Sequence, residues 1–343
     1  MNNSKHATPK LNRWSSYIFD PAIPFEEKAL EVFRFQYKHC AVYRRFCDAL
    51  SKSPDRVEAV QSIPLLPIKA FKEAEVQSFP SDESPDLVFK SSGTRSMSRS
   101  KHVVYDQEIY RRSILKGFEQ HYDLSQLAML AYLPGYSDNP DSSLIWMVNE
   151  LIRETNTELS RFLPFQQPLD LELIDKIAAS NRQLMLFGAA FGLLDLLEME
   201  SSKLYLPPDS LIIETGGMKT HRREMTRDEL HNTLSDGFGI SHGQIHSEYG
   251  MAEMLSQAYQ TGGEWFEPVH WLDISVRDPK DPSAKVTDSQ DGLIGILDLA
   301  NIYSCSFLLT GDRGVQTSDG KFNVLGRWNR KNMRGCNFLI DTD

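Results

Sequence analysis

Short apolar runs alternate with amphipathic segments through the middle of the chain, and this alternation limits the possible folds more than any other feature of the sequence. The runs that resemble strands lie at 87–89, 103–105, 127–133, 183–187, 210–214 and 244–248. A helix through Ile109, Ile114, Leu115 and Phe118 is expected to follow the second run. Strands that alternate with helices pack in layers around a sheet. The middle of the chain is therefore predicted to be an α/β sheet protein.

The two ends of the chain have different patterns. Between Pro24 and Leu50, apolar side chains recur three or four apart, which predicts one amphipathic helix. The last third is predicted to be mostly β; its strands are expected at 269–276, 292–299, 304–309 and 321–325. We expect a helical N-terminal segment at 1–86 packed on the core, an α/β core at 87–265 and a β-rich subdomain at 266–343. One interlocked unit and two subdomains are both compatible with this division.

Charge and composition exclude several classes of function. The 343 residues carry a formal net charge of -10, which disfavours a general affinity for nucleic acid or acidic membranes because their phosphates repel acidic proteins. No apolar run approaches the ~20 residues that cross a bilayer. The polar first ten residues lack the apolar stretch of a secretory signal. We therefore expect a cytoplasmic protein with no nucleic-acid partner and no membrane span.

The four cysteines are too few and too irregularly spaced for a disulfide framework or a zinc site. Cys40, Cys47 and Cys305 lie in apolar segments and are expected to be buried, reduced thiols. Cys336 differs because it follows a glycine close to the end of the chain.

A polar stretch between two predicted strands concentrates hydroxyl groups and cations within an acidic protein. Its residues of interest are Ser91, Ser92, Gly93, Thr94, Arg95 and Lys101. Backbone N–H groups and hydroxyls can donate to phosphate oxygens, and the cations supply compensating charge. The stretch matches neither the Walker pattern nor the Rossmann pattern. It predicts a polyphosphate cradle, with a solvated hairpin loop as the alternative.

Further short strings follow in a fixed order. They are Gly216-Gly217 at the end of a predicted strand, His246 to Glu253, Thr310-Gly311-Asp312, and Gly326-Arg327. The Gly-Gly pair would let the backbone lie flat against a ligand. Each string alone could be a plain turn, but the ordered set is hard to explain as a series of loops.

In this order, the strings resemble the motifs of the adenylate-forming enzymes, which include acyl-CoA ligases and the adenylation domains of peptide synthetases. The resemblance covers roughly residue 89 to the end of the chain. Within this superfamily, His246 to Met251 and Arg334-Gly335-Cys336 most resemble the LuxE-type acyl-protein synthetases. The resemblance implies the large N-terminal domain of the superfamily, with mixed sheets and helices and a C-terminal β-rich subdomain. The small mobile C-terminal domain is expected to be absent.

The resemblance also implies that ATP and Mg²⁺ bind to these strings, which makes 87–265 the nucleotide-binding core. The residues implied to contact ATP are Ser91, Ser92, Gly93, Thr94, Arg95, Lys101, Gly216, Gly217, Tyr249, Gly250, Met251 and Asp312. Glu253 is implied as a catalytic residue and as the ligand of Mg²⁺. Arg327 is implied to assist Asp312 at the ribose. His246 is implied to line the acyl or nucleotide pocket, with a hydrogen-bonded core histidine as the alternative.

Cys336 is implied as the residue that receives the acyl chain, because LuxE-type proteins use a cysteine near the C-terminus in this way. The neighbouring cations Arg327, Arg330, Lys331 and Arg334 would favour its thiolate. The alternative is a closing strand at 337–340, which would make Cys336 a packed residue.

The sequence departs from the superfamily pattern at several positions. Ala252 stands where a threonine usually meets the α-phosphate, and Arg95 stands where many relatives have a second hydroxyl. Without the C-terminal domain and its lysine, a cation from the remaining body must face the carboxylate and the α-phosphate. The candidates are Arg95, Lys101, Lys219 and Arg327.

The leading hypothesis is ATP-dependent activation of a carboxylic acid, with a fatty acid as the expected substrate. The acyl group would then pass to a thiol of Cys336, of a partner such as an acyl-donor or reductase protein, or of coenzyme A. One alternative is a coenzyme A ligase for a small or aryl acid. Another is a non-catalytic nucleotide-binding scaffold or sensor subunit. An acyl site could be lined by Phe187, Phe191, Leu193 and Leu194, although these residues fit a buried helix equally well.

Overall fold

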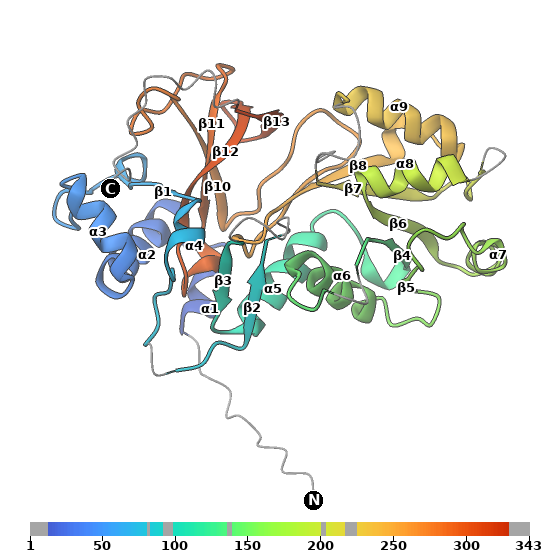
Figure 1. The fold of residues 1–343 in the computed structure, drawn as a ribbon, viewed down its shortest axis with the longest axis horizontal. Helices are drawn as coiled ribbons and strands as arrows, with labels where there is room; N and C mark the ends of the chain where they lie inside the picture. Colours follow the sequence, from blue (N-terminus) through green and yellow to red (C-terminus); the bar gives the residue numbers. More distant parts are fainter. Residues whose placement is uncertain are drawn as a thin grey trace, which may run out of the picture.

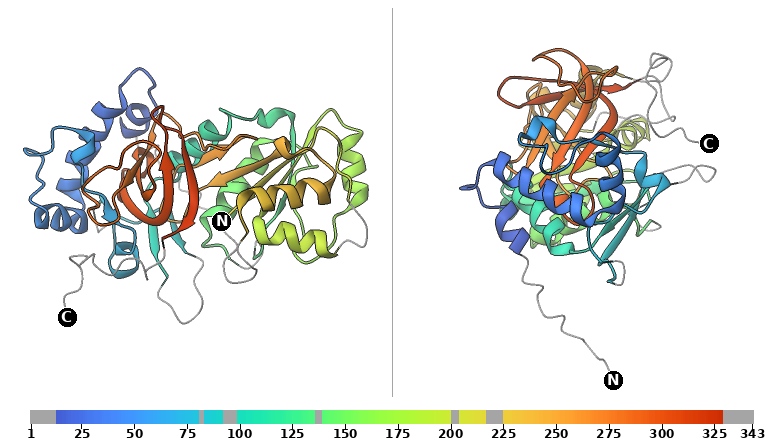
Figure 2. Two further views of the ribbon diagram at one scale, coloured as in Figure 1. Left: turned by 90° about the horizontal axis from the view of Figure 1, so that it is seen from above. Right: turned by 90° about the vertical axis from the view of Figure 1, so that its left-hand side faces the viewer.

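The computed structural model describes residues 13–80, 83–91, 99–135, 139–199, 204–216 and 225–328. Two sheets, one α/β and one β-rich, lie beside each other with their covering helices (Figures 1 and 2). A hairpin of two antiparallel strands, β2 (Leu87–Lys90) and β3 (Lys101–Val104), lies next to the β-rich sheet. In Figure 1 the β-rich sheet, with the N-terminal helices against it, is on the left, and the α/β sheet is on the right.

The α/β sheet has six strands in the order β5-β4-β6-β7-β8-β9. Its strands are β4 (Leu127–Tyr132), β5 (Arg161–Phe162), β6 (Gln183–Ala189), β7 (Leu211–Thr215), β8 (Ile245–Tyr249) and β9 (Ala258–Gln260). All neighbours pair in parallel except β8 and β9. Every residue of β4 is buried, which is typical of a parallel strand covered on both faces. The predicted α/β sheet is therefore confirmed.

The helices of this sheet divide between its two faces. They are α5 (Gln107–Phe118), α6 (Ser143–Glu154), α7 (Leu171–Ala178), α8 (Ala190–Met199) and α9 (Arg227–Phe238). Side chains alternate between the faces of a strand, and Leu130 shares its core with α7, α8 and α9. Met129, one residue earlier, shares its core with α5 and α6. This second core continues into the β-rich sheet and the N-terminal helices.

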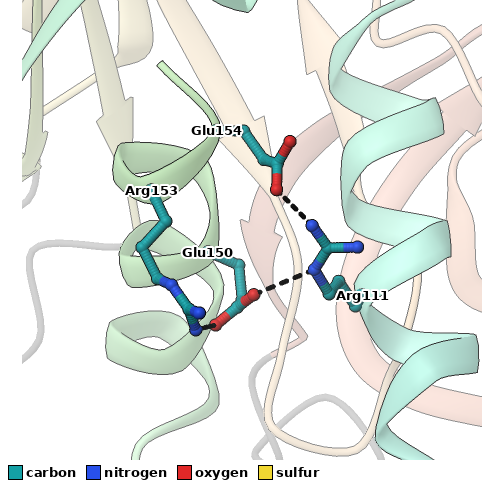
Figure 3. A network of polar contacts seen from close by, with 4 residues as sticks. All are labelled: Arg111, Glu150, Arg153 and Glu154. Carbon is teal, nitrogen blue, oxygen red and sulfur yellow. Dashed lines mark hydrogen bonds and ion pairs between the residues drawn. The ribbon is translucent and has the colours of Figure 1, made fainter. Parts of the chain in front are cut away.

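Ion pairs join α5 to α6 (Figure 3). The Arg111 guanidinium donates to Glu150 at 3.1 Å and also to Glu154. Glu150 is buried and accepts a second hydrogen bond from Arg153 at 3.0 Å. Because both oxygens of the Glu150 carboxylate have cationic partners, its charge is compensated in the low-dielectric space between the helices.

The β-rich sheet has the order β1-β12-β11-β10, with β13 paired to β12. Its strands are β1 (Leu66–Pro67), β10 (Leu272–Arg277), β11 (Gly292–Asp298), β12 (Phe307–Gln316) and β13 (Phe322–Arg327). The strands are antiparallel except that β1 runs parallel to β12. A short helical turn, η4 (Leu299–Asn301), connects β11 toward β12. The mostly β character predicted for the last third of the chain is confirmed over the described residues.

The N-terminal segment packs its helices on this sheet. They are α1 (Arg13–Ile18), α2 (Phe25–His39), α3 (Ala41–Ala49) and α4 (Ala70–Glu73), with the short turn η1 (Val60–Ser62) between α3 and β1. Gln36 is fully buried and donates to the Ile302 carbonyl at 2.8 Å. The segment also contributes β1 to the sheet. The proposed boundaries at 86 and 265 stay a prediction.

The prediction of a single helix between Pro24 and Leu50 is wrong, because the helix is interrupted at Cys40. Cys40 has φ -96° and ψ 103°, an extended conformation that separates α2 from α3. Apolar periodicity continues across this break because Tyr43 and Cys47 of α3 face the same core as α2, so one extended residue leaves no mark in the pattern. Burial of Cys40, Cys47 and Cys305 as free thiols is confirmed.

The hairpin consists of β2 (Leu87–Lys90) and β3 (Lys101–Val104). Lys90 pairs with Lys101, so the predicted strands are confirmed, and the second begins two residues earlier than expected. The remaining short turns are η2 (Leu124–Gln126) and η3 (His242–Gln244). Among the helices that the structure describes, none combines the length and the apolar character that crossing a bilayer requires.

Candidate active site

Described residues of several predicted strings come together at the carboxyl ends of β7 and β8 and beside β12. Ligands of open α/β sheets bind outside the carboxyl ends of the strands. β7 ends at Thr215, directly before Gly216, and β8 ends at Tyr249, directly before Gly250. The Tyr249 hydroxyl donates to Asp312 Oδ2 at 3.0 Å, which joins the end of β8 to the β-rich sheet.

Asp312 and Arg327 face each other across β12 and β13. The two residues are paired in register, and Arg327 Nε lies 3.4 Å from Asp312 Oδ1. The Arg327 side chain is 82% exposed, so this ion pair contributes little to stability and leaves the guanidinium accessible from solvent. Burial and the neighbouring Asp312 raise the pKa of Tyr249, which therefore stays a hydrogen-bond donor.

Gly216 and Gly250 are needed for different reasons. Gly216 has φ 75°, a left-handed conformation in which a side chain is strained. Gly250 has no such φ, but a Cβ at this position would lie 2.4 Å from Glu248 Oε1. The glycine at 250 therefore makes room for a buried carboxyl group.

Two buried carboxyl groups, Glu214 and Glu248, lie on neighbouring strands below this edge. Glu248 accepts a hydrogen bond from Thr215 Oγ1. Burial, with a further contribution from the charge of Glu214, raises the pKa of Glu248 to about 7. Glu214 accepts from Ser247 Oγ at 2.5 Å, and the His231 ring lies 3.1 Å from the same hydroxyl. These four side chains and His231 form a buried polar network, in which the Thr215 and Ser247 hydroxyls donate to carboxyl groups of the protein.

Glu253 lies a few residues beyond β8 and is 7% exposed. Burial raises the pKa of Glu253, while the Ser100 hydroxyl and the positive charges of Lys72 and Arg327 oppose this rise. A carboxylate in this setting gains stability from any cation that approaches it.

The residues fit Mg²⁺ only together with a substrate. No group of three or more His, Cys, Asp and Glu side chains that could hold a metal ion occurs among the described residues. Glu253 therefore offers a hard oxygen ligand without a complete set of protein ligands around it among these residues. Mg²⁺ is commonly bound in this way, by one or two carboxylates with water and substrate phosphates.

Lys72 is a cation that the sequence analysis missed. It lies on α4, which begins soon after β1, and Ile68 N donates to Leu309 O at 2.9 Å. Because β1 runs parallel to β12, α4 begins beside the residues that lead to Asp312. Lys72 is exposed, and its charge acts on Glu253. No motif surrounds Lys72 in the sequence. Only the pairing of β1 with β12 therefore shows that it lies on the same side of the molecule as the candidate site.

His246, on β8, is buried and has a hydrogen-bond partner for each ring nitrogen. Its Nδ1 is 2.8 Å from the Tyr122 hydroxyl, and its Nε2 is 3.3 Å from the Gly243 carbonyl. The hydroxyl can donate and the carbonyl can accept, so a neutral ring satisfies both contacts. Burial lowers the pKa of His246 to about 4, in agreement with a neutral ring. These are the contacts of the core histidine that the sequence left as the alternative, and a role at the substrate stays a prediction.

The remaining predicted site residues are only partly described. Ser92, Gly93, Thr94, Arg95, Gly217, Lys219 and Cys336 lie outside the described residues. Ser91 lies at the base of the hairpin, where its hydroxyl accepts from Ser100 N at 3.1 Å. Lys101 is exposed and pairs with Glu75 at 2.6 Å. Met251 is half-buried and packs against the main core.

The apolar residues near β6 belong to the interior. Phe187 and Leu193 are fully buried, and Leu194 is nearly so. A Cβ on Gly188 would lie 2.6 Å from Leu193 Cδ2, so the glycine permits close packing of α8 on the strand. The buried-helix interpretation is confirmed for Leu193 and Leu194.

Comparison with known proteins gives one family. The family model described as "Acyl-protein synthetase, LuxE" matches residues 20–126 and 157–342. A curated relative, the long-chain-fatty-acid–luciferin-component ligase of Photorhabdus luminescens, is 35% identical over 68 residues. The match covers 20% of this chain and 57% of that relative, so the chain spans little more than half of the relative's length.

Solved structures share the fold. A 2-hydroxyisobutyryl-CoA ligase in an open conformation, with an acyl-adenylate and CoA, superposes with a TM-score of 0.65 at 14% identity. That match covers 88% of this chain and 69% of the ligase. ATP-bound MatB from Rhodopseudomonas palustris gives a TM-score of 0.51 at 15% identity, covering 73% of this chain and 50% of MatB. At these identities the likeness shows the adenylate-forming fold.

Proposed function

Because this chain belongs to the LuxE acyl-protein synthetase family, we propose that it joins a carboxylic acid to ATP as an acyl-adenylate and then transfers the acyl group to a thiol. The observation that carries this proposal is the meeting of Tyr249, Asp312 and Arg327 at one edge, with Glu253 under the influence of Arg327 and Lys72. These side chains come from both sheets, and together they offer acceptors for a ribose and charges suited to phosphates.

The first step forms one bond and breaks another. A carboxylate oxygen of the acid attacks the α-phosphorus of ATP, the bond to the β-phosphate oxygen breaks, and pyrophosphate leaves. Charge builds on phosphate oxygens, so the work of the protein is positioning and electrostatic stabilisation. We assign Glu253 to hold Mg²⁺, which supplies the charge neutralisation when bound. Arg327 and Lys72 are the described cations that act on this carboxylate.

The ribose is assigned to Asp312. Its carboxylate accepts from the Tyr249 hydroxyl on one oxygen and faces Arg327 with the other. These partners hold the carboxylate in one orientation, and carboxylate oxygens accept hydrogen bonds from a pair of hydroxyls. Gly216 would let the nucleotide approach the backbone after β7.

The second step transfers the acyl group. A thiolate attacks the acyl carbon, the thioester forms, and AMP leaves with the electron pair of the broken mixed-anhydride bond. We propose Cys336 as the acceptor from its resemblance to the family's cysteine, and a long-chain fatty acid as the substrate from the name of the curated relative. Coenzyme A is the alternative acceptor, since the superposed 2-hydroxyisobutyryl-CoA ligase binds it.

Intact mass spectrometry tests the relay. The protein is incubated with ATP, magnesium and a long-chain acid, and then divided into samples with and without hydroxylamine. An added acyl mass that hydroxylamine removes is expected in the wild type and in Cys305→Ala, and it is expected to be absent from Cys336→Ser. Cys305 is a suitable control because it is fully buried. Unchanged acylation in Cys336→Ser would rule out this cysteine as the acceptor.

A further inference from the structure

The backbone that carries Glu253 has few hydrogen bonds of its own. Residues 250–257 form neither helix nor strand, so their backbone groups need partners from elsewhere. The Ala252 carbonyl accepts from His102 Nδ1 at 2.7 Å, and the Glu253 carbonyl accepts from Asn301 Nδ2 at 2.8 Å. Neither His102 nor Asn301 belongs to a predicted motif.

Both partners are locked in place. Asn301 Nδ2 also donates to the Cys305 carbonyl at 2.9 Å, so the amide nitrogen faces two carbonyls and its orientation is fixed. Asn301 Oδ1 therefore faces the ring of His102, 2.9 Å from Nε2. His102 is 1% exposed and Asn301 is fully buried, so water cannot replace either contact at low cost.

A third buried side chain continues the same arrangement. Asp298, at the end of β11, accepts from Leu255 N at 2.7 Å and Ser256 N at 3.0 Å. Its other oxygen accepts from Ser256 Oγ at 2.5 Å. The segment that begins with Ala252 is thus fastened to β3 at one point and to the β11–η4 connection at several.

Both ring nitrogens of His102 face acceptors, Nδ1 the Ala252 carbonyl at 2.7 Å and Nε2 the Asn301 Oδ1 at 2.9 Å. A carbonyl oxygen can only accept, so the ring donates to Ala252 from Nδ1. The link between Asn301 and Glu253 runs through the Asn301 amide and does not depend on the Nδ1 proton.

We propose that His102 and Asn301 are positioning residues that fix the backbone of Ala252 and Glu253 and thereby aim the Glu253 carboxylate. The proposal rests on the proposed function, because it concerns the residue assigned to Mg²⁺. His102 lies on β3, which follows the polar stretch implied to bind phosphate, so the same side chain connects that hairpin to Glu253. Through Asn301 the connection reaches the β-rich sheet that carries Asp312.

Three variants separate positioning from general stability. His102→Phe keeps a ring and removes the donor to the Ala252 carbonyl. His102→Asn restores a donor close to the position of Nδ1. Tyr43→Phe is the matched control, because Tyr43 is a fully buried ring whose hydroxyl donates to another backbone carbonyl, that of Pro64, at 2.7 Å.

Amide hydrogen exchange of the nucleotide-free protein gives a readout that does not require activity. We expect faster exchange at 254–256 in His102→Phe, protection close to the wild type in His102→Asn, and no change there in Tyr43→Phe. Exchange at 254–256 that is equal in His102→Phe and Tyr43→Phe would overturn the proposal. Should His102→Phe fail to fold, His102→Asn and Asn301→Ser against Tyr43→Phe make the same comparison, with faster exchange expected in Asn301→Ser alone.

Kinetics give the second readout. A misplaced Glu253 should lower kcat for adenylate formation, by about 10²-fold for a displacement near 1 Å, with a smaller change in KM for ATP. His102→Asn should recover most of this loss, and Tyr43→Phe should retain the wild-type kcat. A wild-type kcat in His102→Phe would contradict the positioning role. Lack of any adenylation by the wild type would contradict the proposed function instead. Hydrogen exchange would still test whether His102 and Asn301 hold the backbone of Ala252 and Glu253.

Discussion

Glu253 is the single residue on which the proposed chemistry depends most. Glu253→Gln removes the charge and keeps the volume, so we expect adenylate formation to fall by roughly 10²-fold or more with little change in melting temperature. The measurement is AMP release at saturating ATP and acid. Glu264→Gln is the control, because Glu264 is an exposed carboxylate in the segment between β9 and β10. Equal rates in the two variants would detach Glu253 from catalysis.

Asp312 should affect binding rather than turnover. A contact with the ribose is made about equally in the ground state and the transition state, so its loss weakens binding of ATP without a comparable fall in kcat. We expect Asp312→Ala to raise KM for ATP several-fold more than it lowers kcat. Asp319→Ala, in the exposed turn between β12 and β13, should change neither. An unchanged KM in Asp312→Ala would refute the ribose assignment.

Glu248 gives a pH dependence of defined sign. Its pKa is raised from 4.5 to about 7 in the folded protein, so between these values the folded state holds a proton that the unfolded state has lost. Stability from this group therefore falls as the pH rises from 4.5 through 7. Glu248→Gln has no such ionisable group. The difference between its unfolding free energy and that of the wild type should therefore increase by about 1.4 kcal/mol for each unit by which the pH rises in this range. Urea unfolding across this range tests it, and parallel profiles for the two proteins would contradict it.

Among the elements, α5 and α6 provide a comparison within one ion-pair network. The Glu150 side chain is 6% exposed and that of Glu154 is 39% exposed, although both pair with Arg111. Glu150→Gln removes the charge of a buried carboxylate that accepts hydrogen bonds from two cations, and should cost about 1–3 kcal/mol of unfolding free energy. Glu154→Gln should cost less than about 1 kcal/mol. Equal costs measured by urea unfolding would show that burial does not decide the strength of these pairs.

The sequence predicted most strands because local patterns determine them. Apolar runs identified β4, β6, β7 and β8 of the α/β sheet but missed the short strands β5 and β9, and turn residues identified the β-rich region. The break at Cys40 could not be predicted, since a single extended residue does not interrupt the apolar periodicity of α2 and α3. The pairing of β1 with β12 was also missed, because a strand of two residues has no period.

Across the whole molecule, the motifs named residues that the structure brings together, but not the contacts that hold their segments in place. Tyr249 and Asp312 were both named in advance, and the structure joins them by a hydrogen bond. His102 and Asn301, 199 positions apart in the sequence, were missed because their function arises only from contacts between distant segments. The same holds for Lys72, whose place depends on the pairing of β1, the strand before α4, with β12.

Binding of nucleotide to the folded protein should stabilise the whole molecule. A ligand that binds only the folded state raises the unfolding free energy by mass action, by about 2.7 kcal/mol at a free concentration near 100 Kd. We expect ATP with magnesium to raise the melting temperature, and Asp312→Ala to reduce the increase. A melting temperature that does not move at millimolar ATP and magnesium would contradict the nucleotide site.

Acid-dependent exchange of labelled pyrophosphate into ATP tests the central claim most directly, because the exchange requires reversible formation of an acyl-adenylate and no thiol acceptor. With magnesium and a panel of carboxylic acids, we predict exchange in the wild type that depends on a long-chain acid. The exchange should persist in Cys336→Ser and should fall by roughly 10²-fold in Glu253→Gln. Absence of acid-dependent exchange with every acid in the panel, in a folded protein that binds ATP, would contradict the proposal that this chain forms acyl-adenylates.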